Sequence, residues 1–228
     1  MGPFLVKFFR DRKILDSFLD GMFWCNTPEY YRLEDASGIG DKYESCTHSY
    51  RASRDGEGAS IEINGIQIGT LTESTMYSYS TKDRWMHCWF EWTLPETDEE
   101  CVLLVKNVNR MISEFGSLYV VLLRKDVQQL VSRVAALTEL KVNAGTVSYS
   151  PNREDWNSLC KSLSYAYQRE FRFLVGDCST KETSPQKLYY ENGFRDIVLD
   201  NPPISMKDAE TNELLFELTP DGCRTSLK

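Results

Sequence analysis

Residues 167–175 read YQREFRFLV, and they form the clearest strand pattern in the chain. Phe171, Phe173 and Val175 alternate as the inward-facing residues of a β-strand do. Gln168 and Glu170 stand at the head of this strand, and a period of two predicts that their side chains leave it on the same side. A carboxylate at the head of a core strand is either an exposed residue without a function or part of a functional site.

The composition is that of an ordinary globular protein. The 228 residues are 41% hydrophobic and 26% charged, enough to bury a sizeable core. No stretch reaches the roughly 18 apolar residues of a bilayer span. In the opening MGPFLVKFF the apolar run is too short, and charged residues follow too early, for a secretory signal. We therefore expect a cytoplasmic protein with no membrane partner.

Charge and metal-ligand content exclude several classes of function. The 34 acidic and 26 basic residues give a net charge of −8, which disfavours a non-specific nucleic-acid coat protein. The seven cysteines are dispersed and form no C-x-x-C pair, so neither a disulfide framework nor a zinc site is indicated. With two histidines and no phosphate-binding or zinc-protease motif, we expect no metal centre.

Periodicity and turn residues predict more strands than helices. Helices are predicted over 11–21, 26–34, 107–116 and 125–137. Strands are predicted over 4–9, 22–25, 75–80, 101–105, 117–123, 140–150, 170–175, 187–190, 196–200 and 214–218, with a hairpin over 60–71. The aromatic run 84–92 has no clear period and is expected to be a packed core segment.

These elements predict an α+β fold, because the strands do not alternate regularly with helices. No linker divides the chain convincingly, so we expect one domain over 1–228. Residues 35–60 are rich in glycine, serine and charge, and we expect them to form a mobile surface excursion.

Three short polar stretches lie at the ends of predicted strands. They are Arg10, the run Ser78-Tyr79-Ser80-Thr81, and Gln168-Arg169-Glu170. Each alone has an ordinary explanation: a solvated arginine, a turn or helix cap, and a common tripeptide. Strand ends that point into one cleft can nevertheless assemble a binding site.

The order of these stretches along the chain resembles the Arg-Ser-Glu class of the ADP-ribosyltransferase superfamily. The segments VKFFR, LDGMFWCNTPEYYR, IGDKYES, YSYSTKDRWMHCW and YAYQREFRFLV look like successive blocks of a family of uncharacterised bacterial and phage proteins. The resemblance touches most of residues 4–200. It implies a split β-sandwich of two small mixed or antiparallel sheets with flanking helices.

The implied activity is mono-ADP-ribosyl transfer from NAD to a macromolecular acceptor, either protein or RNA/DNA, with release of nicotinamide. Small bacterial and phage members of the superfamily are often toxins or effectors of phage defence and counter-defence. An antitoxin or a host-factor protein is therefore an implied partner. The Q-x-E form of the motif mildly disfavours an arginine acceptor.

The resemblance implies roles for the residues of the last and first stretches. Glu170 matches the catalytic glutamate, which would bond the ribose 2′-hydroxyl and stabilise a cationic transition state. Gln168 would orient the acceptor nucleophile. Arg10 would grip a phosphate or ribose through its fork of donors. Arg172 is either a second phosphate ligand or an ion-pair partner of Glu170.

The middle stretch leaves two registers open. Ser80, followed by Thr81, matches the serine that braces the glutamate and the bound NAD, but Ser78 is an equally arguable match. Tyr79 or Tyr77 would stack near the nicotinamide.

Two carboxylates of IGDKYES, Asp41 and Glu44, either approach the cleft or are ordinary loop residues.

A second hypothesis is a non-catalytic interaction or inhibitor protein on the same fold, with 35–60 and 85–92 as contact surfaces. Geometry separates the two hypotheses. An enzyme requires Arg10, Ser78 or Ser80, and Glu170 to converge on one cleft wide enough for a dinucleotide. Burial of Glu170 against Arg172 without a cleft would exclude the enzyme.

Overall fold

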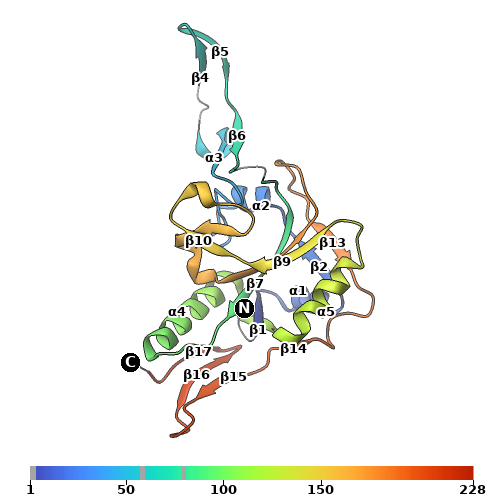
Figure 1. The fold of residues 1–228 in the computed structure, drawn as a ribbon, viewed down its shortest axis with the longest axis vertical. Coiled ribbons are helices and arrows are strands. Elements are labelled where there is room, and N and C mark those ends of the chain that lie inside the picture. The colour runs from blue at the N-terminus through green and yellow to red at the C-terminus, as the bar shows by residue number, and fades with distance from the viewer. Residues whose placement is uncertain (1–3, 57–59, 79–80, 228) are drawn as a thin grey trace.

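A six-stranded antiparallel sheet forms the centre of the molecule (Figure 1). The computed structural model describes residues 4–56, 60–78 and 81–227. The strand order is β14 (Val198–Asp200), β8 (Leu118–Leu123), β1 (Phe4–Phe9), β7 (Trp85–Trp92), β12 (Glu170–Val175) and β9 (Val142–Thr146). The strand predicted from FRFLV is therefore β12, and it begins at Glu170.

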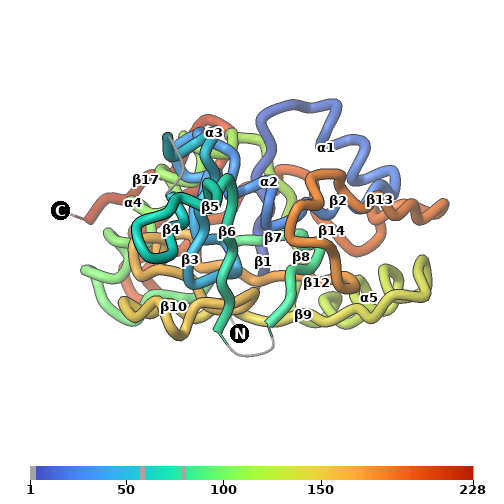
Figure 2. Tube along the Cα trace, turned by 90° about the horizontal axis from the view of Figure 1, so that it is seen from above, coloured from blue at the N-terminus to red at the C-terminus, as the bar shows by residue number. Residues whose placement is uncertain are grey.

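Each face of this sheet carries its own hydrophobic core. Leu5, Phe171 and Phe173 belong to the core on one face, and Val6 and Phe90 to the core on the other. Side chains of α1 (Arg12–Leu19) and α5 (Arg124–Ala135) complete the first core, and those of α4 (Asp98–Phe115) the second. Figure 2 places α4 and α5 on opposite sides of the molecule. The central strands are covered on both faces, so β7 is apolar at most positions. Its sequence therefore lacks the alternation of apolar and polar residues that identifies a half-buried strand.

Strand β1 separates from β7 after three residues. Phe4, Leu5 and Val6 pair with β7, whereas all six residues of β1 pair with β8. Beyond Val6 the side chain of Lys7 crosses to β7, where its Nζ donates to the carbonyl of Cys88 at 2.9 Å. The two strands therefore diverge toward the end of β1 that leads to Arg10.

The remaining strands form small sheets around the central one. They are β2 (Met22–Cys25) with β13 (Gln186–Tyr189), β3 (His48–Arg51) with β6 (Glu73–Met76), β4 (Ser60–Ile63) with β5 (Ile66–Thr70), β10 (Ser148–Ser150) with β11 (Cys160–Ser162), and β15 (Ile204–Lys207), β16 (Leu214–Thr219) and β17 (Gly222–Arg224) together. The short helices are α2 (Pro28–Leu33), α3 (Ala52–Asp55), η1 (Arg153–Asp155) and η2 (Leu163–Gln168). The β4–β5 hairpin projects from the body as an arm (Figure 1). The predicted α+β class is confirmed.

Helix α4 corrects one sequence prediction. The run CVLLV was expected to be a strand leading into a helix, but residues 98–115 form one continuous helix. Thr97 caps it through the amide of Glu100, and three acidic residues follow in the first turn, where the helix dipole favours negative charge. Cys101, Leu104, Val105 and Val108 are buried at helical spacing, which a short apolar run does not reveal.

The expected surface excursion is also corrected in part. Asp41, Glu44, Ser49 and Arg51 are buried, so several polar side chains of the segment 41–51 lie inside the molecule, although Lys42 and His48 are exposed. Glu44 and Arg51 bond to other buried charged groups and do not face water. Residues 57–59 lie outside the described part of the chain.

Candidate functional site

A buried group of ionised side chains lies at the head of β12. Glu170 Oε2 accepts from Arg172 Nε at 2.8 Å, and Glu170 Oε1 accepts from Lys161 Nζ at 2.8 Å. The side chain of Glu170 is 8% exposed. Of the two roles expected for Arg172, the structure shows the ion-pair partner of Glu170.

Two carboxylates from the 41–51 segment complete the group. Glu44 accepts from Arg172 Nη1 at 2.8 Å and from Nη2 at 2.9 Å. Lys161 Nζ also lies 3.4 Å from Glu44 Oε2 and 3.7 Å from Asp41 Oδ2. We call these five residues, Asp41, Glu44, Lys161, Glu170 and Arg172, the Glu170 cluster. It holds three carboxylates against two cations.

Burial and the neighbouring charges act against each other within the Glu170 cluster. Burial alone raises the pKa of Glu170, but the charges of Arg172 and Lys161 outweigh it and hold that pKa well below its usual range. The same balance lowers the pKa of Glu44. For Asp41, burial outweighs the attraction of Lys161, and the negative charge of Glu44 adds to it, so its pKa rises to about 6. Glu170 is therefore ionised at neutral pH.

Gln168 meets Glu170 at a shared donor. Lys161 Nζ donates to Gln168 Oε1 at 3.0 Å as well as to Glu170. Gln168 Nε2 donates to the carbonyl of Gly38 at 2.6 Å. The expected proximity of Gln168 and Glu170 is present, but strand alternation does not cause it. Gln168 ends η2, and Arg169 between them has φ 42° and ψ 52°, a left-handed conformation that is uncommon outside glycine.

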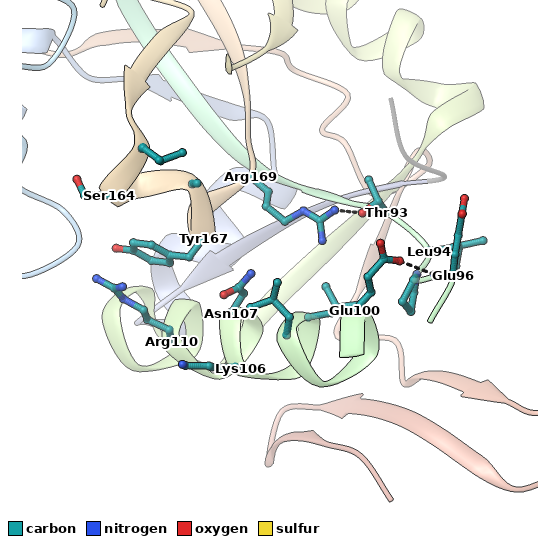
Figure 3. Close-up of a pocket in the computed structure, with 15 residues that line it drawn as sticks. Thr93, Leu94, Glu96, Glu100, Lys106, Asn107, Arg110, Ser164, Tyr167 and Arg169 are labelled. Carbon is teal, nitrogen blue, oxygen red and sulfur yellow. Dashed lines mark hydrogen bonds between the residues drawn. The ribbon is translucent and has the colours of Figure 1, made fainter. Parts of the chain in front are cut away.

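The larger of two described pockets lies beside Tyr167 and Arg169, the neighbours of Gln168 (Figure 3). Its volume is about 740 Å³. Arg169 reaches toward Thr93 across it, whereas Lys106 and Arg110 come from α4 (Figure 3). The full lining is Thr93, Leu94, Pro95, Glu96, Glu100, Leu103, Leu104, Lys106, Asn107, Arg110, Leu163, Ser164, Ala166, Tyr167 and Arg169. Three cations and two carboxylates therefore line a cavity with a partly apolar wall.

Arg10 lies near the end of this pocket and not at Glu170. Its Nε donates to the carbonyl of Glu114 at 3.1 Å. The carboxylate of Glu114 accepts from Arg110 Nε at 2.9 Å and from the Tyr167 hydroxyl at 2.7 Å, and both of these residues line the pocket. The strand register explains the separation.

Val6 and Glu170 both pair with Phe90, so Arg10 is four residues further along β1. At about 3.3 Å per residue, this offset amounts to roughly 13 Å.

The middle stretch lies beside the smaller pocket. Tyr79 and Ser80 lie outside the described residues, so only the flanking Ser78 and Thr81 are placed. Thr81 Oγ1 donates to the carbonyl of Ser78 at 2.7 Å, and both residues line a cavity of about 390 Å³. The other lining residues are Ser148, Tyr149, Ser150, Glu154, Asp155, Asn157 and Cys160. None of the lining residues that the structure describes is a lysine or an arginine.

Tyr149 connects this smaller pocket to Glu170. Its hydroxyl accepts the backbone N–H of Glu170 at 2.8 Å. Tyr77 does not line the smaller pocket. Its ring packs instead near a second charged group, 5.9 Å from the guanidinium carbon of Arg32.

That second group is also buried. Arg32 bonds Asp83 through both terminal nitrogens, at 2.7 and 2.9 Å, and Glu29 at 3.2 Å. Arg51 bonds the same Glu29 at 2.7 and 2.8 Å. We call Glu29, Arg32, Arg51 and Asp83 the Arg32 cluster. Its two carboxylates balance its two cations, and neither described pocket is lined by any of the four.

Sequence reasoning missed Lys161, although it contacts every carboxylate of the Glu170 cluster. Lys161 lies on β11 and is separated from Glu170 by η2, a 3₁₀ segment with no apolar period. A single lysine between Cys160 and Ser162 carries no signal that distinguishes it from a surface lysine.

The convergence of Arg10, Ser78 and Glu170 on one cleft, which the enzyme hypothesis requires, is not present among the described residues. Glu170 is buried against Arg172, and its side chain lines neither described pocket. Arg10 and Ser78 lie beside different pockets. The pockets nevertheless flank the head of β12, one reached through Arg169 and the other through Tyr149.

The aromatic run Trp85–Trp92 is core and not a contact surface. Met86, Trp89, Phe90 and Trp92 are buried in β7, as the packed-core expectation predicts. His87 Nδ1 lies 2.8 Å from the carbonyl oxygen of Trp24. Across 4–56, 60–78 and 81–227, no group of three or more His, Cys, Asp or Glu side chains is placed to hold a metal ion.

Comparisons with protein-family models, with curated proteins and with solved structures found no match to this chain. Among the described residues, no helix is both long enough and apolar enough to cross a membrane.

Proposed function

We propose that this protein is a mono-ADP-ribosyltransferase that takes NAD as its substrate and transfers ADP-ribose to a macromolecular acceptor. The observation that carries the proposal is Glu170 bonded by Lys161 and Arg172 beside Gln168, with one pocket lined by the adjacent Arg169 and another lined by Tyr149. Breaking the nicotinamide bond creates positive charge on the ribose, and a fixed carboxylate stabilises such charge. Gln168 is close enough to Glu170 to orient an acceptor at the same ribose carbon.

The larger pocket suits the dinucleotide better than the smaller one. A pyrophosphate needs cationic partners, and Arg110, Arg169 and Lys106 line the larger pocket. Its volume of about 740 Å³ also falls within the roughly 300–1,000 Å³ of small-molecule sites. The smaller pocket offers Glu154 and Asp155 and no described cation, so it would repel phosphate. We therefore place the phosphates against Arg169 and Arg110, with Arg10 beyond Glu114.

This assignment requires the segment from Tyr167 to Arg169 to move. Glu170 lies behind that segment, and both of its oxygens accept bonds from Lys161 and Arg172. Strained backbone at a functional site is a place where a segment can change conformation, and Arg169 is in the left-handed region. Movement of this segment would open the larger pocket to Glu170, while the bonds from Lys161 and Arg172 keep Glu170 in place and ionised.

The acceptor is proposed to be a protein or a nucleic acid. The net charge of −8 favours a protein, because an acidic surface repels polyphosphate. The implied setting is that of a toxin or a phage-defence effector, with an antitoxin or a host factor as a protein partner.

A second candidate function is a non-catalytic interaction or inhibitor protein on the same fold. The observation that favours it is that both oxygens of the buried Glu170 are already bonded. The larger pocket would then hold a partner segment, because Leu94, Leu103 and Leu163 are exposed along its wall.

Label transfer from NAD tests the proposal. The wild type and Glu170→Ala are incubated with adenine-labelled NAD and a bacterial lysate, and NAD binding is measured by calorimetry. We expect labelled macromolecules with the wild type and none with Glu170→Ala, and sensitivity to protease or nuclease then identifies the acceptor class. Absence of both transfer and NAD binding with the wild type would favour the second candidate.

A further inference from the structure

The arm that projects from the body ends in an apolar face. Its tip is the β4–β5 hairpin, closed by Asn64 and Gly65, which have φ 52° and 77° as a two-residue hairpin turn requires. Four isoleucines of this tip are exposed: Ile61 (45%), Ile63 (58%), Ile66 (68%) and Ile68 (58%). Isolated two-stranded hairpins are marginally stable in water, so this tip lacks the packing that hairpins normally need.

Three of the four isoleucines lie on one side of the hairpin. Ile63 pairs directly with Ile66 across the turn, and Ile61 precedes Ile63 on the same side by strand alternation. The register shifts between Ile61 and Glu62, and Ile68 is the extra residue of the β-bulge there. Glu62 pairs with Gln67, and this pair faces the opposite side. The tip therefore has an aliphatic face and a polar face, as a strand pair in a β-sandwich does.

The base of the arm is held firmly by the body. Arg51, at the end of β3, donates to Ser74 and Thr75 of β6 and bonds Glu29 of the Arg32 cluster. Arg54 donates to the carbonyl of Arg32 at 2.8 Å. These contacts join β3, β6 and α3 to the body, and the hairpin of residues 60–70 makes none of them.

The composition of the tip excludes two kinds of partner. Residues 60–70 contain no lysine, arginine or aromatic residue. Nucleic acids bind through phosphate contacts from basic side chains, and a membrane surface favours basic and aromatic side chains. The tip carries a single charge, that of Glu62, although the whole chain carries −8. Two copies of this acidic chain therefore meet with least repulsion at their tips.

We propose that the isoleucine face of the arm binds the same face of a second copy of this chain. An isologous contact about a two-fold axis would place Ile63 and Ile66 of one protomer against those of its partner. Two hairpins would then form a small four-stranded sandwich with a shared aliphatic core, which meets the packing requirement that one hairpin fails. The contact is independent of the Glu170 cluster and of the proposed reaction.

Sedimentation velocity over a range of micromolar concentrations tests the contact. The full chain is compared with Ile63→Ser/Ile66→Ser and with a control on the polar face, Glu62→Gln/Gln67→Ser. We expect a concentration-dependent dimer for the wild type and the control, and a monomer for the isoleucine variant. Circular dichroism of all three should be the same, because the tip lies outside both cores.

A monomer at every concentration for the wild type would overturn the proposal, as would a dimer that persists in the isoleucine variant. Binding of monomeric wild type to phosphatidylcholine vesicles, lost in the isoleucine variant, would overturn it too and would assign the face to a lipid surface.

Discussion

The Arg32 cluster and the Glu170 cluster are built from the same kinds of side chain but differ in charge balance and surroundings. In the Arg32 cluster, two arginines face two carboxylates, and no described pocket is lined by its members. In the Glu170 cluster, three carboxylates share Lys161 and Arg172, and the pocket residues Arg169 and Tyr149 adjoin it. Both clusters are buried, so burial alone does not distinguish them.

The difference assigns different roles to the two clusters. The Arg32 cluster joins α2 to the base of the arm and to Asp83, which is a structural task. The Glu170 cluster holds one more carboxylate than it has cations, and burial, together with the negative charge of Glu44, raises the pKa of Asp41. Groups whose pKa is shifted by burial and a specific charged partner, close to a pocket, are candidates for function.

The largest expected effect comes from removing the central arginine of either cluster. Arg32→Met leaves two carboxylates and one cation, and we expect it to lower the free energy of unfolding by about 3–5 kcal/mol. Arg172→Met leaves three carboxylates with Lys161 alone, and we expect a still larger loss. Urea unfolding at neutral pH measures both. A smaller loss for Arg172→Met than for Arg32→Met would contradict the difference in charge balance.

Asp41→Asn should have a smaller effect, of opposite sign. The pKa of Asp41 is about 6 in the folded state and ordinarily 3.8, so the folded protein binds its proton more tightly than the unfolded chain does. The free energy of unfolding therefore falls as the pH rises from about 4 to about 6, and the loss is complete above pH 6. We expect Asp41→Asn to be more stable than the wild type by roughly 2–3 kcal/mol at pH 8, with little difference near pH 4.

Thermal unfolding across this pH range measures the effect, with the exposed Asp221→Asn as a control that should follow the wild type. Glu44 and Glu170 act in the opposite direction, because their lowered pKa values stabilise the fold above their unfolded pKa and the contribution is lost as the pH falls. A wild type and an Asp41→Asn variant with parallel stability curves would show that Asp41 is not strained in the cluster.

Local sequence patterns predicted the elements whose signal lies within a few neighbouring residues. The alternation in FRFLV gave β12, and Asn64-Gly65 gave the hairpin, because both signals lie within a few residues. Helix α4 was missed in its first half, since an apolar run of five residues fits either a strand or a buried helix.

The candidate site could be predicted only where its residues are close in sequence. Gln168, Glu170 and Arg172 were expected together; Glu170 and Arg172 belong to the Glu170 cluster, and Gln168 bonds its Lys161. The contacts of Glu44 with Arg172 and Lys161 join segments more than a hundred residues apart, and no local period encodes them. The separation of Arg10 from Glu170 follows from the register of β1, β7 and β12, which one sequence does not reveal.

Nicotinamide release from NAD by a matched pair of variants tests the central claim most directly. Glu170→Gln and Glu29→Gln make the same isosteric change, one in each buried cluster. We expect Glu170→Gln to lower the rate of release by about a hundredfold or more, because it removes the charge that, in the proposed reaction, would stabilise the cationic ribose. We expect Glu29→Gln to lose stability while its folded fraction keeps the wild-type rate. Equal rates for Glu170→Gln and the wild type, or no release by the wild type, would contradict the account.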